Sequence, residues 1–503
     1  MSYESFQTEI GQINDILCTV NLLSWDARTV MPPGGVESRG RQIATLTSLA
    51  RDLATGDTLR RAMAAARRDL SNAPQDAIRL RALDQAQSEI ATLTRIPAAL
   101  IGELAHLKTS AHAAWAEARA ANDFNAYAPL LTRMIAMQRE IGHALGDNPY
   151  DALIGLYEPG MTQARLAVLF GELKAALVPL IEKATAAPQP RSDFLNRSYP
   201  VATQKTFALG IAAKMGYDLN RGRLDDTIHP FEISFTRNDV RITSRFRENW
   251  LPGGMFALWH EAGHGMYEQG VAPAFTRSIF ATDLANLYAV GGASFGMHES
   301  QSRLWENRVG RSRAFWERHF PDLQAHFPDQ LGDVTAAEFW AAVNQVRPDC
   351  IRVEADELTY DLHIILRSEI EAGLMAGELT VADLPAIWAE KMRTYLGREV
   401  PNDTLGVLQD VHWSQGYVGS FPTYTLGNIM ASQIFRAARN VPEIARGLST
   451  ADYAPLHLWL TAGVYRHGRL SSPAETLARV ADSTLDTAPY IADLTSKVME
   501  LTQ

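Results

Sequence analysis

Cysteine is scarce in this sequence of 503 residues, which holds only Cys18 and Cys350. The two form neither a CxxC pair nor the spacing of a zinc ribbon, so a cysteine-rich metal site is excluded. Such low usage is typical of a reducing compartment, where thiols stay free and no disulfide joins them. We therefore expect a cytoplasmic protein with two buried thiols.

Long apolar runs and dense basic clusters are also missing. The first residues, MSYESFQTEIGQ, lack the basic and apolar regions of a secretion signal. The formal net charge is −10 at pH 7, with 47 Lys and Arg against 57 Asp and Glu. The sequence thus predicts no membrane span, and it predicts that neither nucleic acid nor a membrane is a partner.

The sequence does contain the material for a large core, because 46% of its residues are apolar and 9% aromatic. Apolar residues recur at helical spacing over most of 3–186 and again after 250. FEISFTRNDVRITSRF, residues 231–246, instead alternates apolar and polar residues around a turn. We predict a mainly α fold with one small antiparallel β-sheet. It would form a single domain, 1–503, with a connection between two lobes at the proline-rich stretch 187–200.

The most informative short motif is HEAGH, residues 260–264. On a helix, His260 and His264 lie one turn apart and project from one face, which suits two imidazole ligands on one zinc ion. Glu261 stands beside the first ligand, where its carboxylate can take a proton from metal-bound water. The alternative is an ordinary amphipathic helix that happens to carry two histidines.

A catalytic zinc site needs a third protein ligand and an open position. The longer pattern HExxHxxGxxH is not followed here, so the third ligand must come from elsewhere. The segment SFGMHESQSRLWEN, residues 294–307, offers Glu299. Glu268 lies one turn after His264, but a ligand from the same helix would strain the coordination, and we expect its carboxylate to be solvated or paired along the helix.

Several separated motifs resemble those of the carboxypeptidase Taq family of metallocarboxypeptidases. They are HEAGH at 260–264, HESQ at 298–301, IRVEAD at 351–356, GVLQDVHW at 406–413 and DVRIT at 239–243. The resemblance implies a two-lobed, neurolysin-like helical fold with a deep groove, commonly a homodimer, that removes single residues from the free C-terminus of peptides. It implies that His260, His264 and Glu299 bind zinc, for which cobalt can substitute, and that Glu261 is the general base. The connection 272–290 is longer than the family pattern.

A C-terminal exopeptidase must recognise a carboxylate, and a guanidinium does so through paired, planar hydrogen bonds. Arg352 of IRVEAD is the first candidate and Arg241 of DVRIT the second. The alternative for each is a structural ion pair, with Asp356 for the former and Asp239 for the latter.

Cleavage of a peptide bond passes through an oxyanion that needs hydrogen-bond donors. By analogy with related helical zinc peptidases, His412 and Tyr424 fill this role, with Tyr417 as the rival of Tyr424. The alternative for each is a packed aromatic side chain without a catalytic role. Asp410 is expected to orient His412 or a nearby backbone group.

We therefore predict a zinc metallocarboxypeptidase in which zinc-bound water attacks the last peptide bond with Glu261 as general base. One alternative is a related oligoendopeptidase without the carboxylate clamp, and another is a non-catalytic peptide-binding protein of the same fold. GASFG at 292–296 also matches the serine-hydrolase pattern GxSxG around Ser294. That reading requires an α/β sheet which the sequence does not predict.

Overall fold

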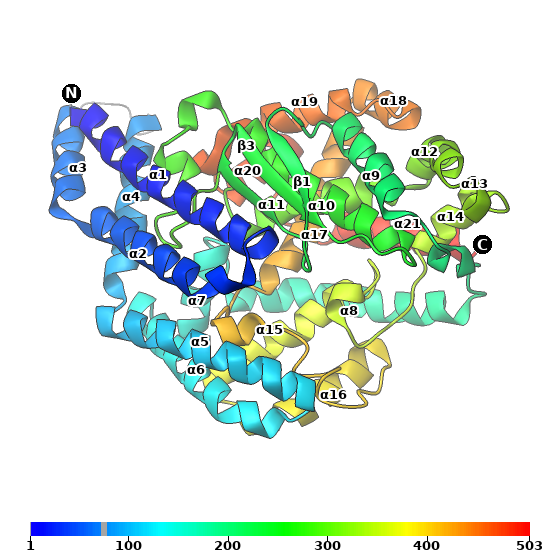
Figure 1. Ribbon diagram of the computed structural model, residues 1–503, viewed down its shortest axis with the longest axis horizontal. Coiled ribbons are helices and arrows are strands. Elements are labelled where there is room, and N and C mark those ends of the chain that lie inside the picture. Colours follow the sequence, from blue (N-terminus) through cyan, green and yellow to red (C-terminus); the bar gives the residue numbers. More distant parts are fainter. Residues whose placement is uncertain (1, 72–77) are drawn as a thin grey trace. The chain divides into compact units, whose positions relative to one another are not determined.

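The computed structural model describes residues 2–71 and 78–503 (Figure 1). It is mainly α-helical with one small sheet, which confirms the predicted fold class. The chain forms two compact units. The first unit comprises Met1–Thr94, Arg191–Val343 and Met430–Leu485, and the second comprises Arg95–Pro190, Asn344–Ile429 and Asp486–Gln503. One of the crossings between them, at 190–191, falls inside the stretch 187–200.

The α-helices of the first unit are α1 (Ser2–Thr29), α2 (Val36–Thr55), α3 (Asp57–Asp69), α4 (Ile78–Arg95), α9 (Val201–Met215), α10 (Leu251–Gly270), α11 (Phe295–Arg303), α12 (Arg313–His326), α13 (Pro328–Leu331), α14 (Ala336–Val343), α18 (Pro442–Thr450), α19 (Ala454–Gly463) and α20 (Pro473–Ala481). A π-helix, η5 (Leu304–Gly310), continues α11. Those of the second unit are α5 (Ala98–Ala121), α6 (Phe124–Leu145), α7 (Pro149–Tyr157), α8 (Gln163–Ala186), α15 (Tyr360–Ala376), α16 (Leu384–Leu396) and α21 (Ala488–Leu501), while α17 (Pro422–Arg439) runs from the second unit into the first.

The sheet in the first unit has the strand order β1-β3-β2. Strands β2 (Glu232–Thr236) and β3 (Asp239–Ser244) form the predicted antiparallel hairpin. Strand β1 (Gly222–Asp226) pairs parallel to β3, so the sheet is mixed and not antiparallel throughout. β1 carries mostly polar side chains and joins the sheet through its backbone. A side chain at Gly222 would overlap the Tyr217 hydroxyl.

Helix α10 is held in the core by its apolar side chains. Trp259 is fully buried among Phe256, Phe315 and Trp316, and its indole nitrogen donates to a backbone carbonyl of α9. Gly263, inside HEAGH, lies so close to α11 that a Cβ there would come within 2.6 Å of backbone atoms of Gln301 and Ser302. The glycine therefore permits the close approach of α10 and α11 on which the site depends.

The N-terminal helices form a separate layer of the first unit. α1 packs against α2, α3 and β2, and Figure 1 shows α1 and α2 side by side. Their core also receives Ile279, Phe280 and Leu284 from the connection 272–290. The long connection is therefore packed into the fold and forms part of this core.

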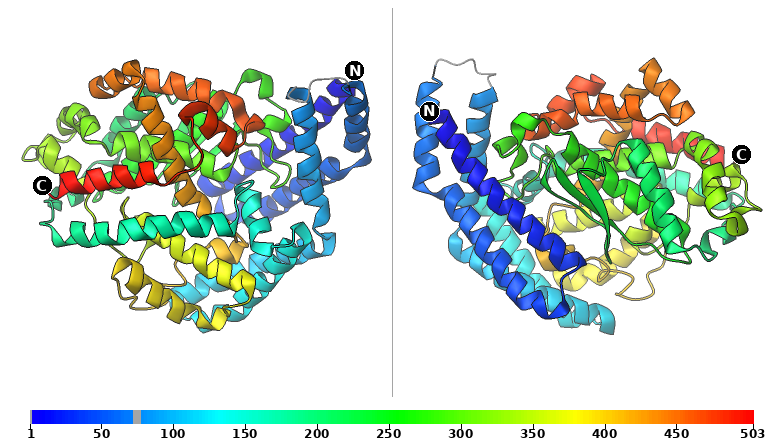
Figure 2. Two further views of the ribbon diagram at one scale, coloured as in Figure 1. Left: turned by 180° about the vertical axis from the view of Figure 1, so that it is seen from behind. Right: turned by 45° about the horizontal axis from the view of Figure 1, so that its top comes forward.

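The second unit is built around α15, whose residues Ile364, Ile365 and Leu366 are fully buried. α8 and α21, far apart in the sequence, run side by side (Figure 2).

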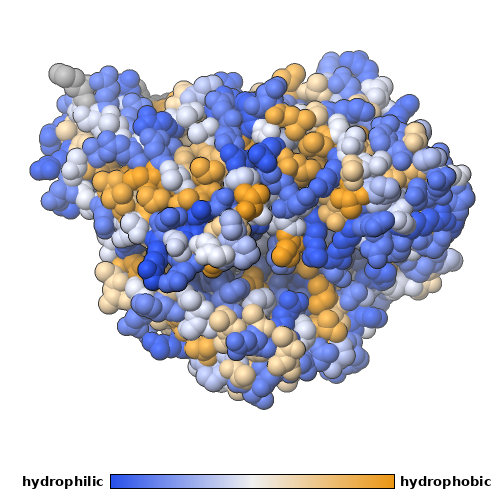
Figure 3. All heavy atoms as spheres, viewed as in Figure 1, coloured by the Kyte–Doolittle hydropathy of each residue, from blue (hydrophilic) through white to orange (hydrophobic). Residues whose placement is uncertain are grey.

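Hydrophilic residues cover much of the face seen in Figure 3, with apolar ones scattered among them. Among the described residues, no helix combines the length and apolarity that crossing a membrane requires.

Candidate functional site

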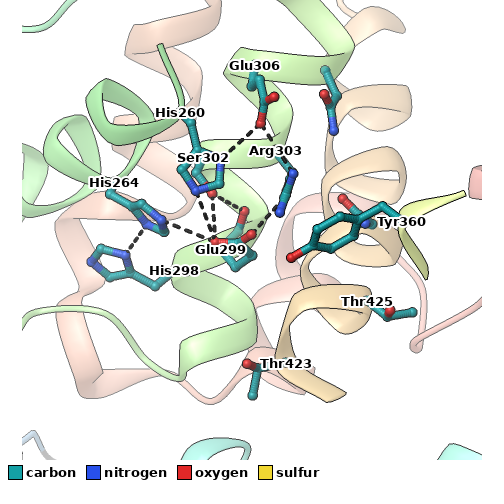
Figure 4. A network of polar contacts seen from close by, with 12 residues as sticks. His260, His264, His298, Glu299, Ser302, Arg303, Glu306, Tyr360, Thr423 and Thr425 are labelled. Atoms are coloured by element: carbon teal, nitrogen blue, oxygen red, sulfur yellow. Dashed lines mark hydrogen bonds and ion pairs between the residues drawn. The ribbon is translucent and has the colours of Figure 1, made fainter. Parts of the chain in front are cut away.

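Three side chains from two helices converge in the first unit (Figure 4). α10 presents His260 and His264, and α11 presents Glu299. Oε2 of Glu299 lies 3.2 Å from Nε2 of His264 and 3.5 Å from Nε2 of His260. The three ligand atoms all lie within 4.8 Å of one another. The structure thus brings together the three metal ligands proposed from the sequence.

Both imidazoles turn Nε2 inward because their outer nitrogens are held. Nδ1 of His260 lies 2.9 Å from Oε2 of Glu306, on the π-helix η5, a type of helix that is frequent at functional sites. Nδ1 of His264 lies 2.5 Å from Nδ1 of His298. A metal-bound imidazole needs such an outer partner. Two imidazole nitrogens and a carboxylate oxygen are a donor set that zinc accepts, so the residues present fit a divalent metal ion.

Arginines hold the carboxylates of this centre. Nε of Arg303 donates to Oε1 of Glu299 at 2.7 Å, and its Nη1 lies 3.3 Å from Oε2 of Glu306. Nη2 of Arg311 lies 3.3 Å from the other oxygen of Glu306. Oε2 of Glu299, which faces the imidazoles, also accepts a hydrogen bond from the Ser302 hydroxyl at 3.1 Å.

The electrostatics of the centre follow from burial and from its carboxylates. Burial raises the pKa of Glu261 to about 7, and Glu299 adds to this shift. Burial lowers the pKa of His264 to about 3. Burial also opposes a charge on His260, but Glu299 and Glu306 outweigh it and raise that pKa to about 10. The buried carboxylates on α10, α11 and η5 are Glu261, Glu268, Glu299 and Glu306. Carboxylates gathered around two imidazoles suit a cation.

Glu268 differs from the expectation of a solvated carboxylate. It is 5% exposed, and its Oε1 lies 2.8 Å from Nε2 of His298. Both of its oxygens also accept a hydrogen bond from the backbone N–H of Gly291. The prediction was wrong because its partners lie beyond the connection 272–290, although its position one turn after His264 does place it on the face of α10 that carries the metal ligands.

An arginine cluster occupies the second unit. Arg352, from a short 3₁₀ turn, and Arg367, from α15, both bind Asp410. Nη2 of Arg352 lies 2.8 Å from Oδ1, and Nε of Arg367 lies 2.6 Å from Oδ2. Nη1 of Arg352 donates to the Tyr360 hydroxyl at 3.1 Å. Two buried guanidiniums share one carboxylate, which leaves an excess of positive charge.

The alternative predicted from the sequence, an ion pair between Arg352 and Asp356, names the wrong partner for Arg352. Asp356 instead accepts backbone hydrogen bonds from Leu358 and Thr359, just before α15 begins. Asp410 takes its place, and although burial opposes its charge, Arg352 and Arg367 hold the pKa of this carboxyl well below its usual range.

His412 and Tyr424 are brought together in the second unit. Nε2 of His412 lies 3.3 Å from the Tyr424 hydroxyl, and the ring packs on Phe421 with centroids 4.4 Å apart. Burial lowers the pKa of His412 to about 4, so the ring is neutral at pH 7. Its Nδ1 lies 3.7 Å from Asp410, within ion-pair range but beyond a hydrogen bond. The rival Tyr417 is 37% exposed.

Arg241 and Ser294 have structural partners. Nε and Nη2 of Arg241 donate to the two carboxylate oxygens of Asp239 at 2.9 and 3.0 Å, as the ion-pair alternative expects, and the guanidinium covers Trp25. Ser294 is the N-cap of α11, where its hydroxyl accepts from the N–H of Met297. GASFG is therefore a helix cap here and not a strand-to-helix nucleophile turn.

Comparison with known proteins gives a consistent result. A family model described as carboxypeptidase Taq (M32) metallopeptidase matches residues 5–498. Thermostable carboxypeptidase 1 of Thermus thermophilus is 40% identical, over 95% of each chain. Carboxypeptidase 1 of Bacillus subtilis is 36% identical, over 96% of this chain and 95% of its own. Among solved structures, an M32 carboxypeptidase from Deinococcus radiodurans superimposes with a TM-score of 0.94 at 38% identity, over 100% of this chain and 99% of the other.

Proposed function

The chain belongs to the carboxypeptidase Taq (M32) family of metallopeptidases, and we propose that it is a zinc-dependent carboxypeptidase that removes single residues from the free C-terminus of peptides. The observation that carries the proposal is the convergence of His260, His264 and Glu299, with Glu261 beside the first ligand and further buried carboxylates around them.

The metal would be held by His260, His264 and Glu299. When bound, zinc would supply Lewis acidity that polarises the carbonyl of the scissile bond and makes water more acidic. Cobalt accepts the same nitrogen and oxygen donors and would substitute for it. Arg303 and Ser302 hold the Glu299 carboxylate so that Oε2 stays turned toward the two imidazoles.

Glu261 would act as general base and then as general acid. Its carboxylate takes a proton from the water that attacks the peptide carbonyl and passes this proton to the departing amine nitrogen, which makes the amine a better leaving group. The side chain is buried, and the backbone of Glu232 on β2 favours its charged form and so lowers its pKa, against the larger effect of burial.

Arg352 would receive the C-terminal carboxylate of the substrate. Its cluster holds one more guanidinium than carboxylate, so a substrate carboxylate restores the balance. Arg241 is less suited, because its single guanidinium is already balanced by the single carboxylate of Asp239. Asp410 would be the positioning residue that keeps Arg352 in place.

His412 and Tyr424 would donate hydrogen bonds to the substrate carbonyl and oxyanion. A neutral His412 and the Tyr424 hydroxyl lie 3.3 Å apart in a hydrogen bond, which a substrate oxygen would replace in order to accept from both.

We further propose that the protein works in the cytoplasm, supported by two free thiols, and as a homodimer, supported by its resemblance to the family.

One experiment tests the function. An N-blocked peptide, in free-acid and C-terminally amidated forms, is incubated with the zinc-loaded protein and with a Glu261→Gln variant, and the products are read by mass spectrometry. Stepwise loss of residues from the free acid alone, absent with the variant, is the expected result. Internal cuts in both forms would instead identify an oligoendopeptidase. No cleavage by a zinc-loaded protein would indicate a peptide-binding protein.

A further inference from the structure

We propose that His298 is a positioning residue for the metal centre. Together with Glu268 and the backbone of Gly291, it holds the ring of His264 in the orientation and tautomer that can bind a metal through Nε2. The inference rests on the proposed metal site, and it assigns a role to the histidine of HESQ, the residue next to the ligand Glu299.

The direction of each hydrogen bond follows from the geometry. Nε2 of His264 faces Glu299 and must keep its lone pair for a metal, so the ring hydrogen sits on Nδ1. Nδ1 lies 2.5 Å from Nδ1 of His298, which must then accept, so the hydrogen of His298 sits on Nε2. Nε2 of His298 lies 2.8 Å from Oε1 of Glu268, which accepts it. Each ring nitrogen of His264 and His298 thus has a single role, as hydrogen-bond donor, hydrogen-bond acceptor or metal ligand.

Glu268, the last acceptor in this series of hydrogen bonds, is itself held in place. The two oxygens of Glu268 accept the N–H of Gly291 at 2.9 and 3.0 Å. An ionised carboxylate offers only acceptors, so it fixes which nitrogen of His298 carries the hydrogen. Gly291 follows the connection 272–290, whose apolar residues lie in the core of the N-terminal helices. The long connection thereby fixes the position of the final acceptor.

The ring of His298 is also confined by packing. One face lies against Tyr267, with centroids 5.3 Å apart, and its Nδ1 edge meets the edge of His264, with centroids 4.6 Å apart. A Cβ at Gly292 would come within 2.3 Å of this ring, so the glycine leaves the space that the imidazole fills. A ring packed on one face and bonded at both nitrogens keeps these nitrogens aimed at His264 and Glu268.

The two ligand imidazoles are therefore supported differently. His260 contacts the carboxylate of Glu306 directly, whereas His264 reaches a carboxylate only through a second imidazole. His298 and Glu299, consecutive residues of α11, contact the two nitrogens of the His264 ring. Glu299 faces Nε2, and His298 faces Nδ1. Loss of His298 should weaken the metal site without removing a ligand.

An isosteric pair of variants tests the proposal. His298→Leu removes the acceptor, while His298→Asn, of nearly the same shape, places an acceptor oxygen where Nδ1 stood. Zinc affinity is measured by competition with a chromophoric chelator, and the visible spectrum of the cobalt(II) form reports ligand geometry. We expect His298→Leu to bind zinc about 10- to 100-fold more weakly than wild type, with a changed cobalt spectrum, and His298→Asn to recover most of the affinity.

Two further variants complete the test. Glu268→Gln removes the negative charge at the end of this series of hydrogen bonds. It should also weaken zinc binding, so it tests the proposal even if His298→Leu does not fold. Glu317→Gln, the control, makes the same change at an exposed glutamate of α12, and it should leave zinc affinity within twofold of wild type, the margin being about 0.4 kcal/mol.

Equal affinity of the Leu and Asn variants, or wild-type affinity in Glu268→Gln, would overturn the role of His298. A wild-type protein that binds no zinc would overturn this inference and the proposed function together, whereas zinc binding without peptide cleavage would overturn the proposed function alone.

Discussion

The metal centre of the first unit and the arginine cluster of the second are both buried networks of charge, but they are built from different groups. In the metal centre, buried carboxylates lie beside imidazoles as well as arginines, whereas in the arginine cluster Arg352 and Arg367 share Asp410. Uncompensated buried charge is costly, and a charged ligand of opposite sign can compensate it. A divalent cation would complete the first network and a substrate carboxylate the second.

The two networks also differ in what neutralises them in the free protein. Each charge of the arginine cluster already contacts an opposite charge, so the cluster is a structural element as well as a proposed binding site. In the metal centre, the inward-facing nitrogens of His260 and His264 both contact the same carboxylate oxygen of Glu299, and among the described residues they have no other ionic partner. Substitutions should therefore affect chemistry in one network and folding in the other.

The largest expected effect is loss of catalysis in Glu261→Gln. The amide cannot take a proton from water, so kcat should fall by about 10²- to 10⁴-fold. Zinc content should be unchanged, because Glu261 is not among the three converging ligands. Peptide hydrolysis and metal analysis of the same preparation measure both quantities. Glu317→Gln, on the surface of α12, serves as the control. Retained activity in Glu261→Gln would assign the base to another group.

In the arginine cluster, Asp410→Asn should act on stability. The substitution leaves two buried guanidiniums without their carboxylate, and removing one partner of a buried pair costs about 3–5 kcal/mol. The free energy of unfolding, measured by chemical denaturation, should fall accordingly.

Asp333→Asn is a matched control for Asp410→Asn. Asp333 also binds two arginines, Arg191 and Arg197, each at 2.6 Å, but on the surface. Solvent screens these pairs, so its denaturation midpoint should not move measurably. If both variants were destabilised equally, burial would not explain the contrast between the two networks.

Metal binding should stabilise the protein by an amount that the arginine cluster does not affect. At a free zinc concentration of about 100 times Kd, a site present only in the folded state adds about 2.7 kcal/mol. This gain should persist in Asp410→Asn and disappear in His264→Gln. Thermal unfolding with and without zinc, after treatment with a chelator, measures it. A gain that survives in His264→Gln would place the stabilising site elsewhere.

The sequence predicts the metal centre better than the arginine cluster, for a physical reason. His260 and His264 lie one turn apart on one helix, so spacing alone places them on a common face, with Glu261 beside the first. Arg352 and Asp410 are 58 residues apart, and Arg367 joins them from α15. No local periodicity links these residues, and the motifs that contain them do not indicate which residues they bind.

The same argument explains why the sequence did not predict two other features, strand β1 of the sheet and the burial of Glu268 at the site. The alternating pattern of 231–246 predicts the hairpin, but β1 is polar and pairs with β3 through its backbone, so it carries no such signal. Glu268 is separated from its hydrogen-bond donor His298 by the connection 272–290, whose path depends on tertiary packing. Interactions across such a connection are not encoded in local spacing.

The smallest expected effect concerns Glu371 of α15, a buried carboxyl that the second unit surrounds with neutral donors. It accepts hydrogen bonds from Trp413, Gly419 and Tyr150 at 2.8, 2.9 and 3.1 Å. Burial outweighs these bonds and raises its pKa from 4.5 to about 7. The folded state therefore keeps a proton that the unfolded chain releases, and the resulting stability is fully present below pH 4.5 and is lost as the pH rises to about 7.

Glu371→Gln isolates this contribution. The difference in unfolding free energy between wild type and variant should change with pH only between about 4.5 and 7, by at most about 1.4 kcal/mol per pH unit. Chemical denaturation followed by tryptophan fluorescence at several pH values measures it. A pH-independent difference would mean that the three donors keep Glu371 ionised, and the second unit would then hold a buried negative charge that partly offsets the excess of its arginines.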